Sequence, residues 1–183
     1  MEELITELRS RYGICSTAYP FGSTVYGTAD EHSDRDIVVI LSTPIEKKES
    51  KARIMDCDVQ IYTEDEWIYK IRNHDIQALE CLNTTPIYEF NHRTFWNRFE
   101  LNREILRESI STICNNSWVK GKKKLIVSGD YDKRAALKSI FHSIRIYKYG
   151  TQVARYGKIT QFDEVNWLWY ELKKLGEEFD ADI

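Results

Sequence analysis

The chain has 183 residues, of which 42% are apolar and 30% charged, and its formal net charge is −3. These values describe an ordinary globular protein with one domain or a tight pair of subdomains. The longest unbroken apolar run, Ile37 to Leu41, is far shorter than the roughly 18 to 20 residues of a membrane span. Because the amino terminus opens with charge rather than a signal peptide, we expect a soluble, cytoplasmic protein.

Charge is distributed unevenly along the chain. Between Lys120 and Lys158, eleven Lys and Arg residues face only two acids, which gives this segment a balance of +9 and leaves −12 elsewhere. A basic segment joined to an acidic one suits a polyanionic ligand held near metal-binding carboxylates. A solvated basic face would produce the same pattern, so the asymmetry alone identifies no ligand.

The first part of the chain predicts a helix followed by a short strand. Apolar side chains at helical spacing indicate a helix over residues 2–12, which ends at Gly13. Residues 14–18 then indicate a strand. Pro20 and Gly22 predict that a loop breaks this strand.

Two further strands are predicted before residue 63. The segment 34–41 is almost wholly apolar after two acids, which is typical of a central strand buried on both faces. Residues 55–62 alternate between apolar and polar side chains, which indicates a second strand of the sheet. The polar segment 42–53 between them predicts a solvated loop.

Helical patterns dominate the remainder of the chain. Segments 64–72 and 75–82 have helical spacing, and from about Arg98 three apolar stripes continue to the end. Because strands come early and helices late, we predict an α+β fold. Its mixed sheet would lie within residues 1–92, followed by a helical carboxy-terminal subdomain over 93–183.

Two acids stand at the head of the predicted buried strand. Asp34 and Asp36 project to the same side of a strand, whereas Arg35 points away. Carboxylates in such a place are costly unless a cation pairs with them, and hard divalent cations prefer carboxylate oxygens. Asp58 on the next strand can complete the set and take a proton from an attacking hydroxyl. Asp56 is its rival, because strand alternation places both acids on one face.

A Gly-Ser pair precedes these acids. Gly22 permits close approach of the backbone, and Ser23 offers a hydroxyl at a strand-to-helix turn that suits the phosphates of a nucleoside triphosphate. Gly-Ser is common in ordinary loops and gains meaning only from its combination with the acids. Two divalent ions on such carboxylates can neutralise the entering and leaving oxygens of nucleotidyl transfer.

This combination resembles the signature of the DNA polymerase β superfamily of nucleotidyltransferases. Ten residues separate the Gly-Ser pair from Asp34-x-Asp36. Within the superfamily, the chain is similar to predicted nucleotidyltransferases of bacteria and their phages, as Asp58, Tyr62 and Ala78-Leu79-Glu80 indicate. The resemblance implies a mixed sheet backed by helices, with residues 1–92 as the catalytic core. It also implies Mg²⁺ or Mn²⁺ as cofactor, held by Asp34, Asp36 and Asp58.

A basic stretch in the helical half is similar to a later part of the same family. It contains Lys138, His142 and Arg145, followed by Gly150. With Tyr149, the three basic residues fall on one narrow helical stripe that can face a cleft. We predict that they contact the triphosphate or an acceptor phosphate. The alternative is a solvated flank on which His142 is hydrogen-bonded locally.

The sequence thus predicts an enzyme that transfers a nucleoside monophosphate from a nucleoside triphosphate such as ATP to a hydroxyl, releasing pyrophosphate. An RNA 3′ end (for example of a tRNA), a protein side chain and a small molecule all fit as acceptor. The basic half favours nucleic acid. The alternatives are antitoxin-like nucleotidylation (AMPylation) of a protein, a non-catalytic nucleotide- or partner-binding protein, and phosphate ester hydrolysis.

Overall fold

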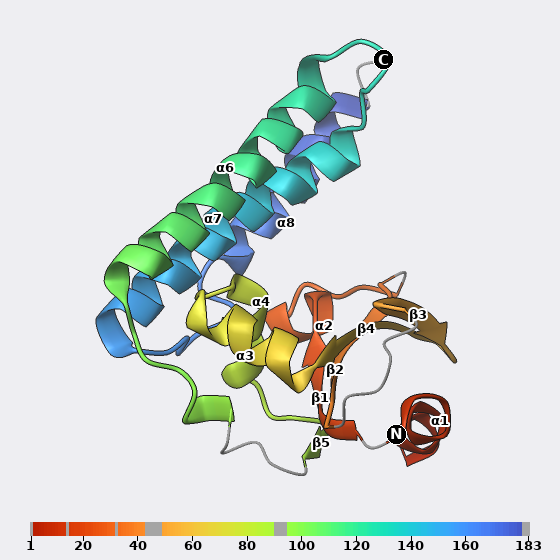
Figure 1. Ribbon diagram of the computed structural model, residues 1–183. Coiled ribbons are helices and arrows are strands. Elements are labelled where there is room, and N and C mark those ends of the chain that lie inside the picture. Colours follow the sequence, from red (N-terminus) through yellow and green to blue (C-terminus); the bar gives the residue numbers. More distant parts are fainter. Residues whose placement is uncertain (1, 14, 32, 43–48, 90–94, 181–183) are drawn as a thin grey trace. The chain divides into compact units, whose positions relative to one another are not determined.

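In the computed structural model, the chain forms two compact units (Figure 1). They are a sheet unit over residues 1–101 and a helical unit over 102–183. The described residues are 2–13, 15–31, 33–42, 49–89 and 95–180. The expected boundary between residues 92 and 93 lies outside them. No helix in these ranges is both long and apolar enough to cross a bilayer.

The sheet unit is built on five strands in the order β3-β4-β2-β1-β5. They are β1 (Cys15–Phe21), β2 (Arg35–Leu41), β3 (Lys51–Ile54), β4 (Cys57–Thr63) and β5 (Tyr88–Glu89). Strands β2 and β4 run parallel, whereas the other neighbouring pairs are antiparallel. The sheet is therefore mixed, as predicted. Its central strand, β2, is buried from Ile37 to Leu41.

Helices cover both faces of this sheet (Figure 1). They are α1 (Glu2–Tyr12), α2 (Ser23–Tyr26), α3 (Glu64–Arg72) and α4 (Ile76–Leu82). Helix α1 packs against the face that carries Val39 and Val59. On the other face, α3 and α4 pack around Val38 and Ile40. Alternate side chains of β2 thus enter two different cores, which explains its unbroken apolar run.

Side-chain caps mark where several helices begin. Helix α3 starts with a capping box in which Thr63 and Glu66 each bind the other's backbone N–H. The carboxylate of Asp75 accepts from two N–H groups at the start of α4, and Asp132 caps α7 (Lys133–Tyr156). Such caps stabilise a helix end by about 1 kcal/mol each.

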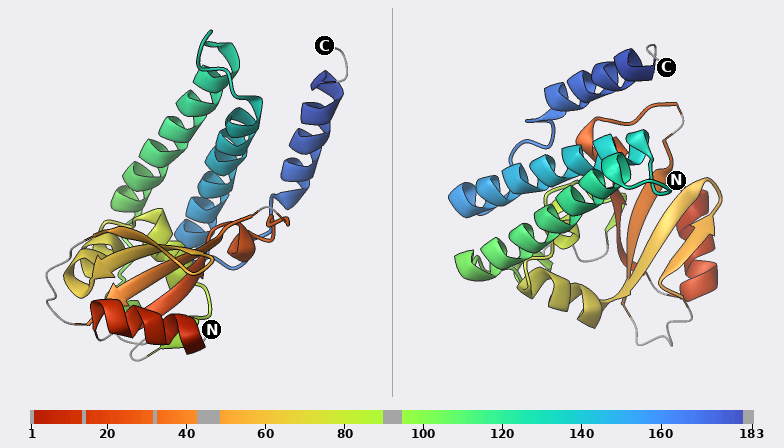
Figure 2. Two further views of the ribbon diagram at one scale, coloured as in Figure 1. Left: turned by 90° about the vertical axis from the view of Figure 1, so that its right-hand side faces the viewer. Right: turned by 90° about the horizontal axis from the view of Figure 1, so that it is seen from above.

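The helical unit contains α6 (Arg103–Ile126), α7 (Lys133–Tyr156) and α8 (Asn166–Asp180), in accord with the predicted helical subdomain. Helices α6 and α7 lie side by side (Figure 2). Glycines permit this close approach: a Cβ on Gly121 would lie 2.7 Å from Cγ1 of Ile140, and one on Gly150 would lie 2.8 Å from Cγ1 of Ile110.

Two local predictions are wrong. Strand β1 continues through Pro20 to Phe21, because β5 pairs only with its earlier residues and leaves the proline, which has no N–H, with a single neighbouring strand. The predicted loop over 42–53 ends in a strand, β3. A turn at Met55 and Asp56 joins β3 to β4, with Met55 at φ 53°, and this turn lacks the usual Asn-Gly signal.

Substitution of Gly121 by Ala tests the helix contact. Alanine normally gains about 1 kcal/mol over glycine inside a helix, but here its Cβ would also lie 3.1 Å from the carbonyl oxygen of Ala136. We expect a net loss of about 1–3 kcal/mol in the free energy of unfolding, measured by urea denaturation. The exposed Lys122→Ala is the control and should change it by less than about 0.5 kcal/mol. A gain for Gly121→Ala would contradict the close packing.

Candidate active site

The parallel strands β2 and β4 bring two of the predicted acids together. Asp36 is the register partner of Asp58. Each is the second residue of its strand. Strand alternation therefore places both on the sheet face covered by α3 and α4, the face of Val38 and Tyr62. Asp34 stands two residues ahead of Asp36, just before β2 begins. All three acids therefore gather at the amino-terminal ends of two neighbouring strands.

A guanidinium links two of these carboxylates. Nη1 of Arg53 donates to Oδ1 of Asp34 at 2.9 Å and to Oδ1 of Asp58 at 2.6 Å. Arg53 lies on β3 as the register partner of Asp58. Hydrogen bonds to Asp58 and then Asp34 raise the pKa of Arg53 further above its ordinary value. Sequence reasoning missed this arginine, because its strand was not predicted.

The donor set suits a divalent ion of the Mg²⁺ type. Its atoms are carboxylate oxygens, which hard cations prefer, and two of them already converge on one positively charged nitrogen. Within the described residues, however, no group of three His, Cys, Asp or Glu side chains is arranged to hold a metal. Asp34 and Asp58 converge on Arg53 instead. The residues fit the ion in chemistry, and the guanidinium lies between two of the three acids that the sequence predicts as ligands.

The Gly-Ser pair lies against Asp36. Phe21, the last residue of β1, is the register partner of Asp36, and α2 begins at Ser23, so the predicted strand-to-helix turn is present. Gly22 has φ 75° and ψ −154°, a conformation that essentially only glycine adopts. A Cβ there would lie 2.1 Å from Oδ2 of Asp36. The turn and the acid therefore depend on each other's position.

A buried hydrogen bond holds α2 in place. The hydroxyl of Tyr26 donates to Oε2 of Glu80 at 2.8 Å, and both residues are buried. Because Glu80 lies on α4, this bond ties the Gly-Ser turn to the helix layer. The sequence contained a signal for it, since an acid among the apolar residues of a predicted helix needs a partner.

Asp56, the rival of Asp58, lies in the turn between β3 and β4 rather than on the strand. Its Oδ2 accepts from Nη1 of Arg35 at 3.0 Å, and this hydrogen bond is the main cause that lowers the pKa of Asp56. The predicted alternation from residue 55 onward was wrong at this position because β4 begins at Cys57. Asp56 thus has an arginine partner of its own.

The basic residues of the helical half fall on α7 but differ in exposure. Arg145 is 4% exposed, and its Nη2 donates to Nδ1 of His142 at 2.8 Å. Burial, followed by the charges of Arg145, Lys120 and Lys138, lowers the pKa of His142 to about 3. His142 is therefore neutral at pH 7 and serves as a hydrogen-bond acceptor.

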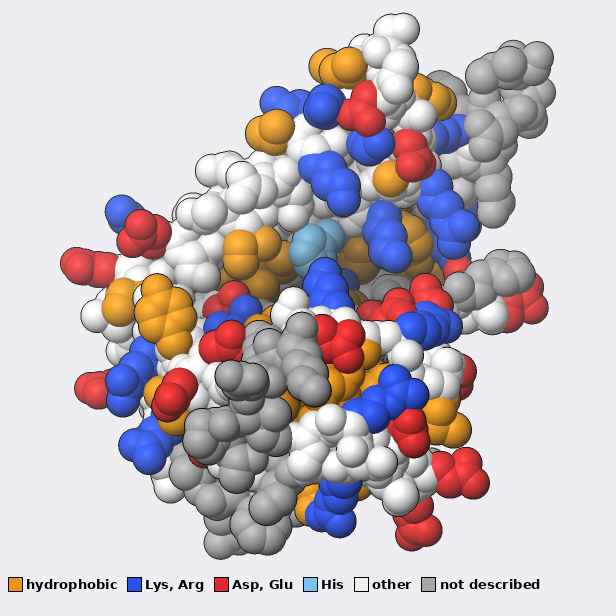
Figure 3. Space-filling view, turned by 45° about the vertical axis from the view of Figure 1, so that its right-hand side comes forward, with side chains coloured by type: hydrophobic (Ala, Val, Ile, Leu, Met, Phe, Trp, Pro, Cys, Tyr) orange, Lys and Arg blue, Asp and Glu red, His pale blue; other side chains and the backbone are white. Residues whose placement is uncertain are grey.

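The predicted stripe on α7 is not uniformly open to a ligand, because Tyr149 is buried along with Arg145. Lys138 is exposed. Lys120 of α6 acts on His142 together with Lys138, a neighbour that spacing within one helix could not reveal. Lys and Arg side chains recur over this unit (Figure 3).

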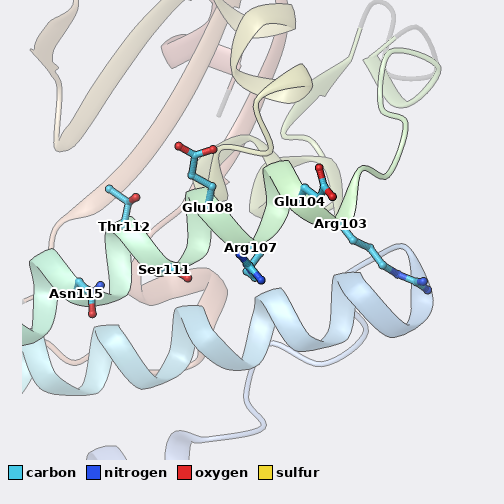
Figure 4. A pocket seen from close by; sticks show the side chains of 7 residues that line it. All are labelled: Arg103, Glu104, Arg107, Glu108, Ser111, Thr112 and Asn115. Carbon is cyan, nitrogen blue, oxygen red and sulfur yellow. The ribbon is translucent and has the colours of Figure 1, made fainter.

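A hollow on the helical unit is separate from these groups. Its lining residues in the described part of the chain belong to α6 (Figure 4): Arg103, Glu104, Arg107, Glu108, Ser111, Thr112 and Asn115. These seven residues mix acids with bases and include no apolar side chain, whereas ligand pockets are mostly apolar with few polar groups. Its composition points to no particular ligand.

Comparison with known proteins gives one family match. Residues 1–85 match the model of the nucleotidyltransferase domain family. No curated protein matches the chain. A crystal structure of a nucleotidyltransferase-like protein from Exiguobacterium sibiricum is 14% identical, with a TM-score of 0.39, and the match covers 94% of this chain and 62% of that one.

Substitution of Gly22 by Ala tests the dependence of Asp36 on the turn. The backbone strain and the displaced carboxylate should together cost about 2–4 kcal/mol in the free energy of unfolding. Mn²⁺ binding, measured by calorimetry, should weaken. Gly157→Ala is the control, because Gly157 also has positive φ, 72°, but nothing lies within 4 Å of its Cβ position. Equal losses for the two variants would contradict the contact between Gly22 and Asp36.

Proposed function

We propose that this chain, whose residues 1–85 match the model of the nucleotidyltransferase domain family, transfers a nucleoside monophosphate to a hydroxyl acceptor. The donor would be a nucleoside triphosphate. The observation that carries the proposal is the convergence of Asp34 and Asp58 on one cationic nitrogen, beside Asp36. Carboxylate oxygens in this arrangement can ligate divalent ions, and divalent ions stabilise the charge that develops during phosphate transfer.

Each site residue has a role in this proposal. Asp34, Asp36 and Asp58 would hold Mg²⁺ or Mn²⁺, which neutralises the entering and leaving oxygens when bound. Asp58 takes the proton of the acceptor hydroxyl. The hydroxyl oxygen then bonds to the α-phosphorus, and the bond from that phosphorus to the β-phosphate oxygen breaks, so that pyrophosphate leaves.

The turn at Gly22 and Ser23 would receive the phosphates. The first N–H groups of a helix have no acceptor within it, and α2 begins at Ser23. The absence of a side chain on Gly22 leaves its backbone open to close approach. The Tyr26–Glu80 bond keeps this turn in place while the ligand binds.

Label transfer tests the function directly. The protein is incubated with each α-labelled nucleoside triphosphate, Mg²⁺ or Mn²⁺, and cell extract, and label is sought on RNA, protein and small products. Asp34→Asn, Asp36→Asn and Asp58→Asn should each reduce transfer by more than 10- to 100-fold, the loss typical when a group that hydrogen-bonds to a metal ligand is changed. Asp56→Asn, which alters an acid paired with Arg35, should retain it. Transfer that survives in both Asp34→Asn and Asp36→Asn would overturn the assignment.

For the acceptor, we propose RNA bound by the helical unit. Lys138 and Lys120 both lie close enough to His142 to lower its pKa, and neither forms an ion pair with another described residue. Because Arg145 is buried and bound to His142, the exposed lysines would supply the phosphate contacts. Two unpaired cations on adjacent helices suit a polyanion.

Charge reversal tests this acceptor. Lys138→Glu and Lys120→Glu should each weaken binding of a single-stranded RNA, measured by fluorescence anisotropy, and lower the slope of log affinity against log salt by about 1. Lys122→Glu is the matched control, since Lys122 is exposed on α6 about 200° around the helix from Lys120. RNA binding that responds equally to all three changes would indicate only a general charge effect. Label on protein instead of RNA would favour nucleotidylation of a protein.

A further inference from the structure

We propose that Arg53 is a positioning residue. Its side chain occupies the divalent-ion site between Asp34 and Asp58, and it releases these acids and binds the triphosphate when the ion binds. This inference rests on the proposed function of the site. Its starting observation is the single nitrogen Nη1, which lies within hydrogen-bonding distance of both carboxylates.

Arg53 and a divalent ion exclude each other from this position. The guanidinium uses Oδ1 of both acids, and an ion in the place of Nη1 would use the same two oxygens. Two cations within a few ångströms of each other also repel. Binding of the ion therefore requires that the arginine release at least one carboxylate.

The side chain of Arg53 is free to make this movement. It lies on β3, a four-residue strand at the edge of the sheet. The side chain is 52% exposed, and those of Asp34 and Asp58 are 60% and 48% exposed. Ion pairs with this much exposure to solvent are weak, so a divalent ion can replace the arginine at modest cost.

A nucleoside triphosphate gives the released guanidinium a new partner. Divalent ions bridge carboxylates and substrate phosphates in transfer enzymes, so phosphate oxygens would arrive close to the position that Arg53 leaves. The planar guanidinium matches phosphate oxygens with two parallel hydrogen bonds. Arg53 would thus restrain ion binding before the substrate arrives and strengthen substrate binding afterwards.

Binding measurements on the full chain test the inference through two effects of opposite sign. For Arg53→Gln, calorimetric titration with Mn²⁺ alone should show an affinity about 3- to 10-fold higher than that of the unmodified protein. At saturating Mn²⁺, a triphosphate with a non-cleavable α–β bridge should bind about tenfold more weakly. A purely structural role would not move the two affinities in opposite directions.

Two further variants control the experiment. Arg35→Gln removes an arginine that is 51% exposed and also pairs with an acid, Asp56, at 3.0 Å, and it should leave both affinities unchanged. Arg53→Lys keeps the positive charge and should lie between the unmodified protein and Arg53→Gln in both measurements.

The outcomes separate this inference from the proposed function. If the unmodified protein binds Mn²⁺ and Arg53→Gln binds it no more tightly, the role of Arg53 is overturned while the metal site stands. If Mn²⁺ binds more tightly but triphosphate affinity is unchanged, the transfer of Arg53 to phosphate is overturned. If no variant binds Mn²⁺, the metal site of the proposed function fails together with the inference.

Discussion

The register between β2 and β4 is the constraint on which the site depends. It places Asp36 directly beside Asp58, and a slip of one residue would send every side chain of one strand to the opposite face. Such a slip is costly here, because both faces of β2 are buried in separate cores, one with α1 and one with α3 and α4. The apolar residues of the strand thus fix the position of its acids.

This arrangement creates a charge problem that two arginines solve in different ways. Carboxylates gathered at adjacent strand ends repel one another unless cations lie among them. Arg35 pairs with Asp56 in the turn, and Arg53 pairs with both Asp34 and Asp58. The first pair neutralises an acid in the turn between β3 and β4. The second keeps two acids converged on one point, which is the geometry that an ion needs.

The sequence predicted those features that depend on periodicity. Alternation along a strand predicted Asp34 and Asp36 on one side, but β2 begins at Arg35, so only Asp36 lies on the strand. Apolar spacing located α1, α3 and the long helices. The sequence could not predict the register between the parallel strands β2 and β4, because this register depends on contacts between segments far apart in the chain. Arg53 was missed for a related reason, since β3 is short and polar and its turn carries Met55 at positive φ instead of Asn-Gly.

Helical spacing was misleading on α7 for a comparable reason. A helical wheel groups Lys138 with Arg145, but it does not say which neighbouring helix covers each position. In the structure Arg145 is buried and Lys138 is exposed. The charge of Lys120, on α6, lowers the pKa of His142, and Gly121 lets the two helices approach closely.

The neutral state of His142 has a consequence for the charge of the helical unit. Its ring nitrogen accepts a hydrogen bond from Arg145. This partner of the buried guanidinium is uncharged, so the contact does not neutralise the positive charge of Arg145. The segment from Lys120 to Lys158 keeps its balance of +9, while −12 lies elsewhere in the chain. Because salt screens exposed charges beyond about 8–10 Å, only acids close to this segment, such as Glu164 in its ion pair with Lys148 at 3.0 Å, offset its positive charge locally. An anionic ligand therefore responds to the segment it contacts, and the net charge of −3 is a poor guide to what the protein binds.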